Sequence, residues 1–287
     1  MKKIADILRA KGGHWVGDGF PVRSLFSYDG DAQALSPFLL FDYAGPYNFP
    51  PALNPRGVGQ HPHRGFETVT IAYEGEVAHR DSTGGGGTIR PGDVQWMTAA
   101  GGIIHEEFHS PAYTKTGGPF RMVQLWVNLP KKDKMTRAGY QGITSDTIPV
   151  VELANGGGRA RIIAGALGET RGPARTFSPI NLWDLRLNRD AQVTLDLPEG
   201  HTALLAVLSG HVTANGTGAG EAEIIRFERE GREVTLRADG DAMVLILTGE
   251  PLNEPVFGYG PFVMSNEAEI RQAITDFNSG RFGQVGA

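Results

Sequence analysis

The sequence predicts an all-β protein that consists of two β-barrels or sandwiches packed together. Its 287 residues are enough for two domains of ordinary size. The 40 glycines and 18 prolines are spread along the chain, a pattern typical of many short strands joined by tight turns. Short apolar or alternating segments also recur in two series, one on each side of residues 131–148. Each series is long enough to form one all-β domain.

The first half of the chain predicts a short helix followed by strands. Residues 4–11 are expected to form the helix, which Gly12-Gly13 would end. In residues 122–128 apolar side chains occur at every second position, and this period of two gives a strand two different faces. The other strands expected in this half lie at residues 21–28, 66–73 and 94–97.

The second half predicts another series of strands and a final helix. Residues 131–148 are polar and lack a strand pattern, so we expect them to connect two domains, residues 1–145 and residues 146–287. Ser265 is the expected N-cap of a C-terminal helix at residues 266–277. The expected strands of the second domain lie at residues 160–164, 182–187, 192–197, 203–208, 223–227, 233–236 and 242–247.

Composition and charge exclude several classes of protein. The chain has no cysteine, so disulfides, thiolate nucleophiles, zinc fingers and iron–sulfur clusters are excluded, and a metal ion must bind to His, Asp or Glu. The net charge of −5 implies no broad basic surface for nucleic acid. The sequence has neither the continuous apolar segment of a secretory signal nor a run long enough to span a membrane. We therefore expect a cytoplasmic protein.

The segment that begins at His61 is the most informative part of the sequence. Alternate side chains of an extended strand share a face, so His61 and His63 point the same way and Pro62 points to the other side. Because proline donates no ladder hydrogen bond, we expect this strand near an edge or rim. Two imidazoles on one face can converge on a metal ion.

A second pair of ligand-type residues follows in the segment that ends at Glu107. If this segment is extended, His105 and Glu107 share a face and Glu106 points away. The intervening Pro91-Gly92 is a turn signal that brings the chain back toward the first pair. Three imidazoles and one carboxylate suit iron, nickel, manganese, copper, cobalt or zinc. Four protein ligands also leave coordination positions free, as a catalytic metal needs.

Four blocks of the sequence resemble the pirin family of the cupin superfamily, and the resemblance covers residues 15 to 275. The blocks are residues 61–69, 91–105, 124–130 and 251–256. The resemblance implies a bicupin, that is, two jelly-roll barrels, with short terminal helices. It also implies that only the N-terminal barrel holds a metal ion, most often Fe(II). The family's ligands fall on His61, His63, His105 and Glu107.

The sequence departs from the common cupin pattern at two acidic residues. In ordinary cupins the glutamate shortly after His-x-His is the carboxylate ligand, which would be Glu67 here, whereas pirins use the later glutamate. Glu67 is therefore expected as a reserve ligand or a neighbour of the ligands, on the face of His63 if no bulge intervenes. Glu106 is acidic where the family commonly has a small residue, and it would compete with Glu107 if the strand slipped.

Other polar residues are expected to have structural roles. For His79 a satisfied polar residue near a turn is favoured over a barrel-lining residue, and His109 is expected outside the pocket. Arg64 is expected in an ion pair at the rim, and Gln124 and Trp126 share a face that lines either the pocket or the core. No His-x-His or His-x-Glu occurs in the second half, so the second barrel is expected to bind no metal.

The resemblance implies an enzyme. Bacterial pirins resemble flavonol 2,3-dioxygenases, which implies a metal-dependent dioxygenase that cleaves an aromatic polyphenol of the quercetin type with O2 and releases carbon monoxide. Glu107 or Glu67 would be the base that accepts the proton of the substrate's 3-hydroxyl. The resemblance leaves a second function open: a non-enzymatic, iron-binding, redox-sensing regulator that acts through a protein partner without contacting nucleic acid.

Overall fold

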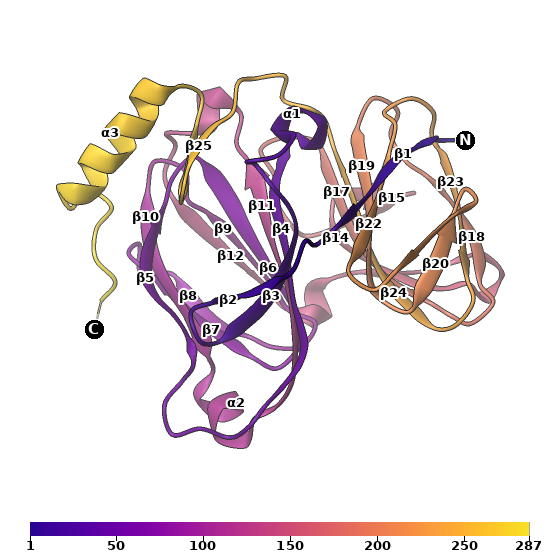
Figure 1. Ribbon diagram of the computed structural model, residues 1–287, viewed down its shortest axis with the longest axis horizontal. Helices are drawn as coiled ribbons and strands as arrows, with labels where there is room; N and C mark the ends of the chain where they lie inside the picture. The colour runs from indigo at the N-terminus through magenta and orange to yellow at the C-terminus, as the bar shows by residue number, and fades with distance from the viewer. Residues whose placement is uncertain (287) are drawn as a thin grey trace. The chain divides into compact units, whose positions relative to one another are not determined.

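The structure, a computed structural model, describes residues 1–286, and strands dominate it (Figure 1). The chain forms two compact units. Unit 1 contains Met1–Lys11, Ala34–Pro37 and Asp146–Leu252, and unit 2 contains Gly12–Gln33, Phe38–Ser145 and the chain from Asn253 onward. Each unit has one seven-stranded and one four-stranded sheet. The expected all-β fold class is confirmed.

Unit 2 contains the motifs on which the sequence analysis depends. Its larger sheet has the order β12-β9-β6-β11-β4-β3-β2, its smaller sheet has the order β5-β10-β7-β8, and all neighbours are antiparallel. These strands are β2 (Gly13–Val16), β3 (Phe20–Ser27), β4 (Phe38–Phe49), β5 (Gly57–His63), β6 (Phe66–Glu74), β7 (Val77–Asp81), β8 (Gly86–Ile89), β9 (Val94–Thr98), β10 (Ile103–His109), β11 (Gly118–Asn128) and β12 (Gly139–Ile143). A hairpin of β25 (Phe257–Tyr259) and β26 (Phe262–Met264) completes the unit.

Unit 1 repeats this arrangement. Its larger sheet has the order β1-β22-β19-β24-β17-β14-β13 and its smaller sheet has the order β18-β23-β20-β21. These strands are β1 (Ile4–Arg9), β13 (Val150–Glu152), β14 (Gly158–Ala164), β17 (Ile180–Leu187), β18 (Gln192–Asp196), β19 (Thr202–Ser209), β20 (His211–Ala214), β21 (Thr217–Gly220), β22 (Glu223–Phe227), β23 (Glu233–Ala238) and β24 (Ala242–Gly249). A small hairpin is formed by β15 (Ala166–Leu167) and β16 (Thr170–Arg171).

Helices are few and short. They are α1 (Ala32–Leu35), α2 (Pro111–Thr116), α3 (Glu267–Asn278) and the 3-10 turns η1 (Lys131–Asp133), η2 (Ser145–Thr147) and η3 (Ala154–Gly156). Within residues 1–286, none of them has the length and apolar character needed to cross a membrane.

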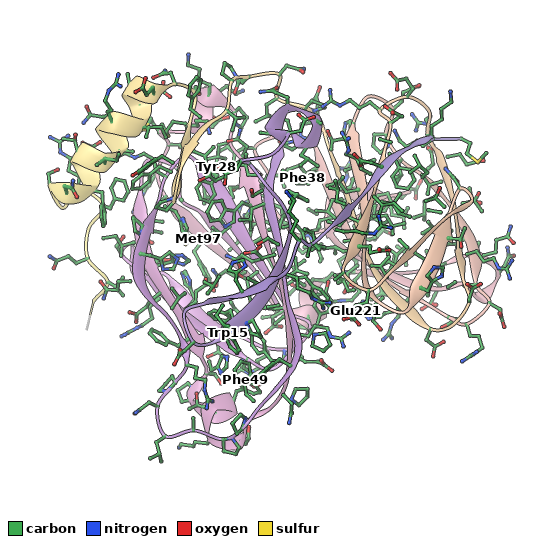
Figure 2. The ribbon with its side chains drawn as sticks, viewed as in Figure 1. Trp15, Tyr28, Phe38, Phe49, Met97 and Glu221 are labelled. Carbon is green, nitrogen blue, oxygen red and sulfur yellow. The ribbon has the colours of Figure 1, made fainter. Side chains whose placement is uncertain are left out.

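One end of unit 2 is closed by aromatic rings. Phe49 is labelled at the lower end of the unit in Figure 2, and its ring centroid lies 5.6 Å from that of Phe120 and 4.5 Å from that of His109. The His109 Nε2 lies 2.9 Å from the carbonyl oxygen of Gly19, to which it donates. His109 therefore belongs to this packed end of the barrel, as expected for a residue outside the pocket.

The helix predicted at residues 4–11 is wrong, because Ile4–Arg9 form the edge strand β1. This strand pairs with β22, and its register shifts between Ile4 and Asp6. The shift lets Ile4 and Ile7 both pack against the core of unit 1, although they are three residues apart. A spacing of three imitates a helical period, and the irregularity in the strand produces it here.

Two further local predictions need correction. The stretch at residues 131–148 contains the strand β12, which pairs with β9 at the edge of the larger sheet of unit 2. An edge strand is half exposed and needs no alternation of apolar residues. The N-cap of α3 is Asn266 and not Ser265, because the Asn266 side chain accepts a hydrogen bond from the backbone amide of Glu269.

Each terminal segment belongs to the unit that is formed mainly by the other half of the chain. The N-terminal strand β1 is part of unit 1, and the C-terminal segment with β25, β26 and α3 is part of unit 2. In Figure 1 this segment, drawn in yellow, lies next to the purple and magenta strands of unit 2. These memberships differ from the division expected at residues 145 and 146, which assigned the N-terminal residues to the first domain and the C-terminal helix to the second.

Buried cations attach the C-terminal segment to the strand connection that follows His63. Arg64 pairs with Asp276 of α3 (Nη1 to Oδ2, 2.9 Å) and donates to the Gly101 carbonyl (2.8 Å). Lys134 donates to the carbonyls of Gly65 (2.7 Å) and Val263 (2.9 Å). The ion pair expected for Arg64 at a rim is therefore a buried pair with α3, because α3 covers this position.

Replacement of Gly65 by alanine is expected to destabilise unit 2 strongly. Gly65 has φ +92°, and a Cβ on it would lie 2.0 Å from the Val263 carbonyl oxygen. The left-handed conformation and this contact together predict a loss of roughly 3 kcal/mol or more in the free energy of unfolding. Urea denaturation of Gly65→Ala measures it. Gly59→Ala is the matched control, because a Cβ on Gly59 meets no atom within 4 Å; equal losses in both variants would contradict the packing argument.

Candidate metal centre

Three imidazoles meet where β5 pairs with β10. His61 lies directly opposite His105 in the antiparallel register, and His63 lies two residues further along β5. One ligand nitrogen from each of the three rings lies within 4.8 Å of the other two. The ring centroid of His105 is 4.2 Å from that of His61 and 4.8 Å from that of His63. The structure thus brings together the three histidines that the sequence analysis selected.

The hydrogen bonds leave several imidazole nitrogens free toward this cluster. The His61 Nδ1 lies 2.8 Å from the Gly59 carbonyl, to which it donates, so its Nε2 carries the lone pair. Within residues 1–286, the buried His63 Nδ1 and His105 Nε2 have no hydrogen-bond partner. Buried polar atoms normally have partners, and a metal ion bound between the rings would supply one.

The protonation states also suit a metal ion. Burial lowers the pKa of His63 and of His105 well below 6.5, and the neighbouring imidazoles lower it further. Both rings are therefore neutral near pH 7, which is the form that coordinates a metal.

Glu107 adds a carboxylate to the cluster. A ligand atom of Glu107 lies within 4.8 Å of ligand nitrogens of His105 and of His79. The Thr70 hydroxyl oxygen is 3.4 Å from the Glu107 Oε1 but only 2.6 Å from the Gln124 Oε1. Its single hydrogen goes to the shorter contact, so the carboxylate of Glu107 stays available to a cation.

His79 is at the site, which is a correction of the sequence analysis. It is fully buried rather than placed at a turn, and its Nδ1 lies 3.2 Å from the His105 Nδ1. On its other side the His79 Nε2 lies 3.1 Å from the Asp81 Oδ2. The signal that would have found this pair is its i, i+2 spacing on one strand, the same spacing that selected the four expected ligands.

Asp81 is held as a carboxylate. Burial raises its pKa, but hydrogen bonds from His79 and from the hydroxyl and amide of Thr83 outweigh burial and keep that pKa at about 2. The ring of Tyr140 stacks on His79 with a centroid distance of 5.3 Å. The hydrogen bond between His79 and the Asp81 carboxylate is thus shielded from solvent.

The structure separates Glu67 from the cluster. Phe66 and Thr70 face the site, since Phe66 contacts the ring of His63 and Thr70 contacts Glu107. Glu67 therefore points to the opposite face of β6, where its Oε1 accepts a hydrogen bond from Thr98. Glu67 was expected on the same face as His63. It lies on the other face because Gly65, at φ +92°, interrupts the extended chain between β5 and β6.

Glu106 also points away from the cluster. It forms a salt bridge with Arg80, the residue directly opposite it on β7 (Nη2 to Oε1, 2.5 Å). Successive side chains of a strand point to opposite faces, so Glu107 and not Glu106 faces the imidazoles.

Partly exposed side chains surround the cluster. Trp126 stacks on Phe66 with a centroid distance of 4.3 Å, and its ring lies 5.2 Å from that of His63. His61, Gln124 and Trp126 are all only half-buried. The face that Gln124 and Trp126 share therefore borders the site.

The buried carboxyl of Glu67 predicts a pH-dependent stability. Burial raises its pKa to about 7, against a hydrogen bond from Thr98 that lowers it. The folded protein then holds a proton that the unfolded chain releases near pH 4.5, so stability is lost as the pH rises from 4.5 through 7. Glu67→Gln, which stays neutral, is expected to gain about 3 kcal/mol over the wild type between pH 5 and pH 8.

Urea denaturation at a series of pH values measures this gain. Glu169→Gln, at an exposed position, is the control and is expected to follow the wild type. A constant difference between Glu67→Gln and the wild type across the series would show that Glu67 ionises normally in the folded protein.

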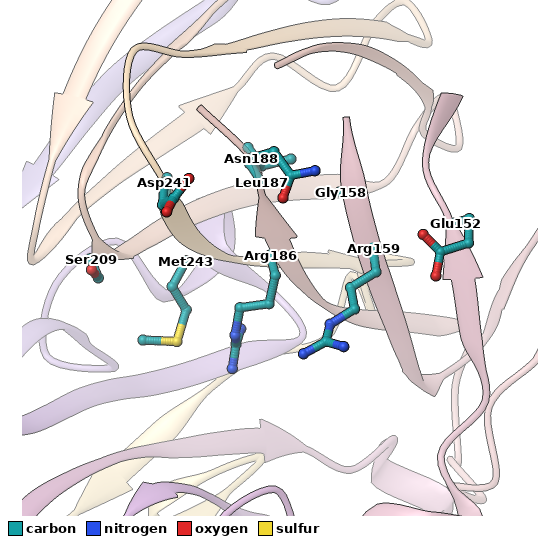
Figure 3. Close-up of a pocket in the computed structure, with 10 residues that line it drawn as sticks. Glu152, Gly158, Arg159, Arg186, Leu187, Asn188, Ser209, Asp241 and Met243 are labelled. Atoms are coloured by element: carbon teal, nitrogen blue, oxygen red, sulfur yellow. The ribbon is translucent and has the colours of Figure 1, made fainter. Parts of the chain in front are cut away.

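A separate cavity in unit 1 offers no comparable cluster. It has a volume of about 560 Å³, and Figure 3 shows Arg159 and Arg186 projecting from the neighbouring strands β14 and β17. The two arginines are direct cross-strand partners. Within residues 1–286, all groups of three or more side chains close enough to share a metal ion lie in unit 2.

The residues of unit 2 fit a divalent transition metal. Three imidazoles and a carboxylate are donors of intermediate softness. Among the described residues, the buried His63 Nδ1 and His105 Nε2 have no hydrogen-bond partner, as expected for nitrogens that bind a metal ion. The partial exposure of His61 leaves room for ligands that do not come from the protein.

Comparison with known families gives two matches along the chain. Residues 19–127 match the family model described as pirin, and residues 182–283 match the model described as the pirin C-terminal cupin domain. A Pseudomonas aeruginosa protein provisionally named as a quercetin 2,3-dioxygenase is 56% identical over 282 residues, covering 98% of this chain and 99% of that protein.

Solved structures resemble the whole chain. The crystal structure of quercetin 2,3-dioxygenase from Acinetobacter baumannii is 55% identical, with a TM-score of 0.97 and coverage of 100% of both chains. The structure of a bacterial pirin from Escherichia coli in complex with nickel(II) is 20% identical, with a TM-score of 0.66 and coverage of 86% of this chain and 99% of that chain. The latter likeness shows a shared fold.

Proposed function

Because this chain belongs to the pirin family, we propose that it is a metal-dependent dioxygenase that cleaves a flavonol of the quercetin type with O2 and releases carbon monoxide. The observation that carries the proposal is the cluster of His61, His63 and His105 with Glu107 beside it. The full-length similarity to a structure named quercetin 2,3-dioxygenase supports the substrate class. A cytoplasmic location goes with this proposal.

His61, His63, His105 and Glu107 would hold one divalent transition metal, and we propose Fe(II). Nickel is the alternative that the Escherichia coli relative suggests, and manganese, copper, cobalt and zinc suit the same donors. When bound, the metal supplies Lewis acidity, which lowers the pKa of a hydroxyl group that coordinates to it.

The surrounding side chains would orient the substrate. The stacked rings of Phe66 and Trp126 form an apolar wall beside His63, which suits the flat rings of a polyphenol. Glu107, rather than Glu67, would accept the proton of the 3-hydroxyl group, because Glu107 lies beside His105 whereas Glu67 points to the other face of β6.

The overall reaction sets the experiment. One quercetin and one O2 give one carbon monoxide and one depside ester, so two bonds of the heterocycle break and both oxygen atoms of O2 enter the ester. Oxygen uptake by Fe(II)-loaded protein with quercetin, with carbon monoxide measured in the headspace, is expected to show a ratio of one to one. Full metal loading without uptake would reject the enzyme and favour the regulator that acts through a protein partner.

A further inference from the structure

The metal centre has a buried chain of hydrogen bonds behind it. The chain runs from the His105 Nδ1 to the His79 Nδ1 (3.2 Å) and from the His79 Nε2 to the Asp81 Oδ2 (3.1 Å). The strands explain its geometry, because His105 lies opposite Asp81 and Glu107 lies opposite His79 in the pairing of β10 with β7. All three side chains are buried.

The partners of Asp81 fix the tautomer of each ring. A carboxylate only accepts hydrogen bonds, so the His79 Nε2 carries the proton and the His79 Nδ1 carries the lone pair. That lone pair faces the Nδ1–H of His105 and the side-chain amide of Gln95, whose Nε2 lies 3.2 Å away. The His105 Nε2 then carries the lone pair of its ring, and it is the buried nitrogen without a partner.

His79 is itself close enough to be considered as a metal ligand. It forms a group with His105 and Glu107 in which the ligand atoms lie within 4.8 Å of one another. A metal ion at the His79 Nδ1 would, however, compete with the Gln95 amide for the same lone pair. It would also leave the buried His105 Nε2 unsatisfied. A metal ion at the His105 Nε2 gives that nitrogen a partner and leaves the hydrogen bond between Gln95 and His79 intact.

We propose that His79 and Asp81 are positioning residues of the metal centre, which hold the His105 imidazole with its Nε2 directed at the metal ion. The inference rests on the proposed metal centre and extends it by two residues. A ligand histidine whose second nitrogen is hydrogen-bonded has a fixed ring orientation and a higher basicity, and loss of such a partner typically weakens metal binding by roughly 10–100-fold.

The test measures Ni(II) binding by calorimetry, which does not depend on turnover. His79→Ala is expected to raise the Kd roughly 10–100-fold. His79→Asn is expected to recover part of the affinity, because its Oδ1 takes the place of the Nδ1 that accepts from His105. Asp81→Asn keeps the ring of His79 but removes the charge that fixes its tautomer, and a smaller loss is expected.

The control is His109→Gln, which removes a buried histidine from the same strand as His105 but from the aromatic end of the barrel. It is expected to bind Ni(II) as the wild type does. Near-UV circular dichroism of each metal-free variant shows whether the barrel is intact, and the Asp81→Asn result decides the matter if His79→Ala does not fold.

Ni K-edge X-ray absorption separates positioning from ligation. The number of coordinated imidazoles is expected to be the same in the wild type and in His79→Asn. Loss of one imidazole would show that His79 is a ligand and would overturn the proposal, as would wild-type affinity in both His79→Ala and Asp81→Asn. A wild-type protein that bound no Ni(II) would overturn the metal centre itself, which is a different outcome from failure of this inference.

Discussion

His63→Ala is expected to abolish stoichiometric metal binding. His63 is buried, its ring lies 4.8 Å from that of His105, and its Nδ1 has no partner among the described residues. Removal of a residue that only supports a ligand costs roughly 10–100-fold in affinity, so loss of a ligand is expected to cost more. Carbon monoxide release from quercetin should disappear with the metal.

The metal content of the purified variant, measured by plasma mass spectrometry, checks this result. The variant loses the hydrogen bond of His63 with the Pro261 backbone, so near-UV circular dichroism of the metal-free variant is measured beside the metal content to show that the barrel is intact. His201→Ala, in unit 1, is the control for histidine content. One metal ion per chain in His63→Ala, with the wild-type Kd, would show that the ion binds elsewhere.

Glu107→Gln is expected to lose roughly 10²–10⁴-fold in kcat per bound metal, the range typical for removal of a general base. Glutamine keeps the shape of the side chain but does not take up the proton of the 3-hydroxyl group. The affinity for the metal should fall as well, because the variant lacks the one carboxylate of the ligand cluster. Division of kcat by metal content separates the two effects.

Glu106→Gln is the matched control for this prediction. Glu106 is the neighbouring acid, and it pairs with Arg80 on the other face of β10. Glutamine keeps the length of the side chain and an oxygen that can accept from Arg80, so Glu106→Gln is expected to retain wild-type turnover per bound metal. If Glu106→Gln lost turnover and Glu107→Gln kept it, the assignment of the two faces of β10 would be wrong.

The period of two predicted correctly which side chains share a face where the chain stays extended. Within β5 and within β10 it placed the histidine pair and the His105–Glu107 pair on their shared faces. It failed for Glu67, because the alternation of faces was counted from His63 through Gly65, where the backbone leaves the extended region. A sequence shows a glycine but not the sign of its φ.

Long-range packing accounts for the other failures. The apolar spacing of Ile4 and Ile7 imitates a helix, and only the pairing with β22 shows that a register shift produces it. Arg64 has an acidic neighbour in sequence, yet its partner Asp276 is 212 residues away. No local sequence pattern indicates which distant carboxylate will form an ion pair with a buried arginine. His79 could have been found from the sequence, because its spacing of two from Asp81 is the spacing that selected the other ligand pairs.

Each unit contains one terminal segment that is far in sequence from most of the unit. This separation affects how the protein folds and where the chain can be cut. The N-terminal residues bond to a part of the chain that is made long after them: the amide of Lys2 donates to the Glu233 carbonyl, and Lys2 Nζ donates to the Arg229 carbonyl across 227 positions. Contacts of such high sequence separation slow folding, because loop closure comes before the gain in energy. Residues 1–145 alone contain neither unit in full. For the same reason, a gene cut at that junction would encode two fragments that each lack a piece of their own barrel.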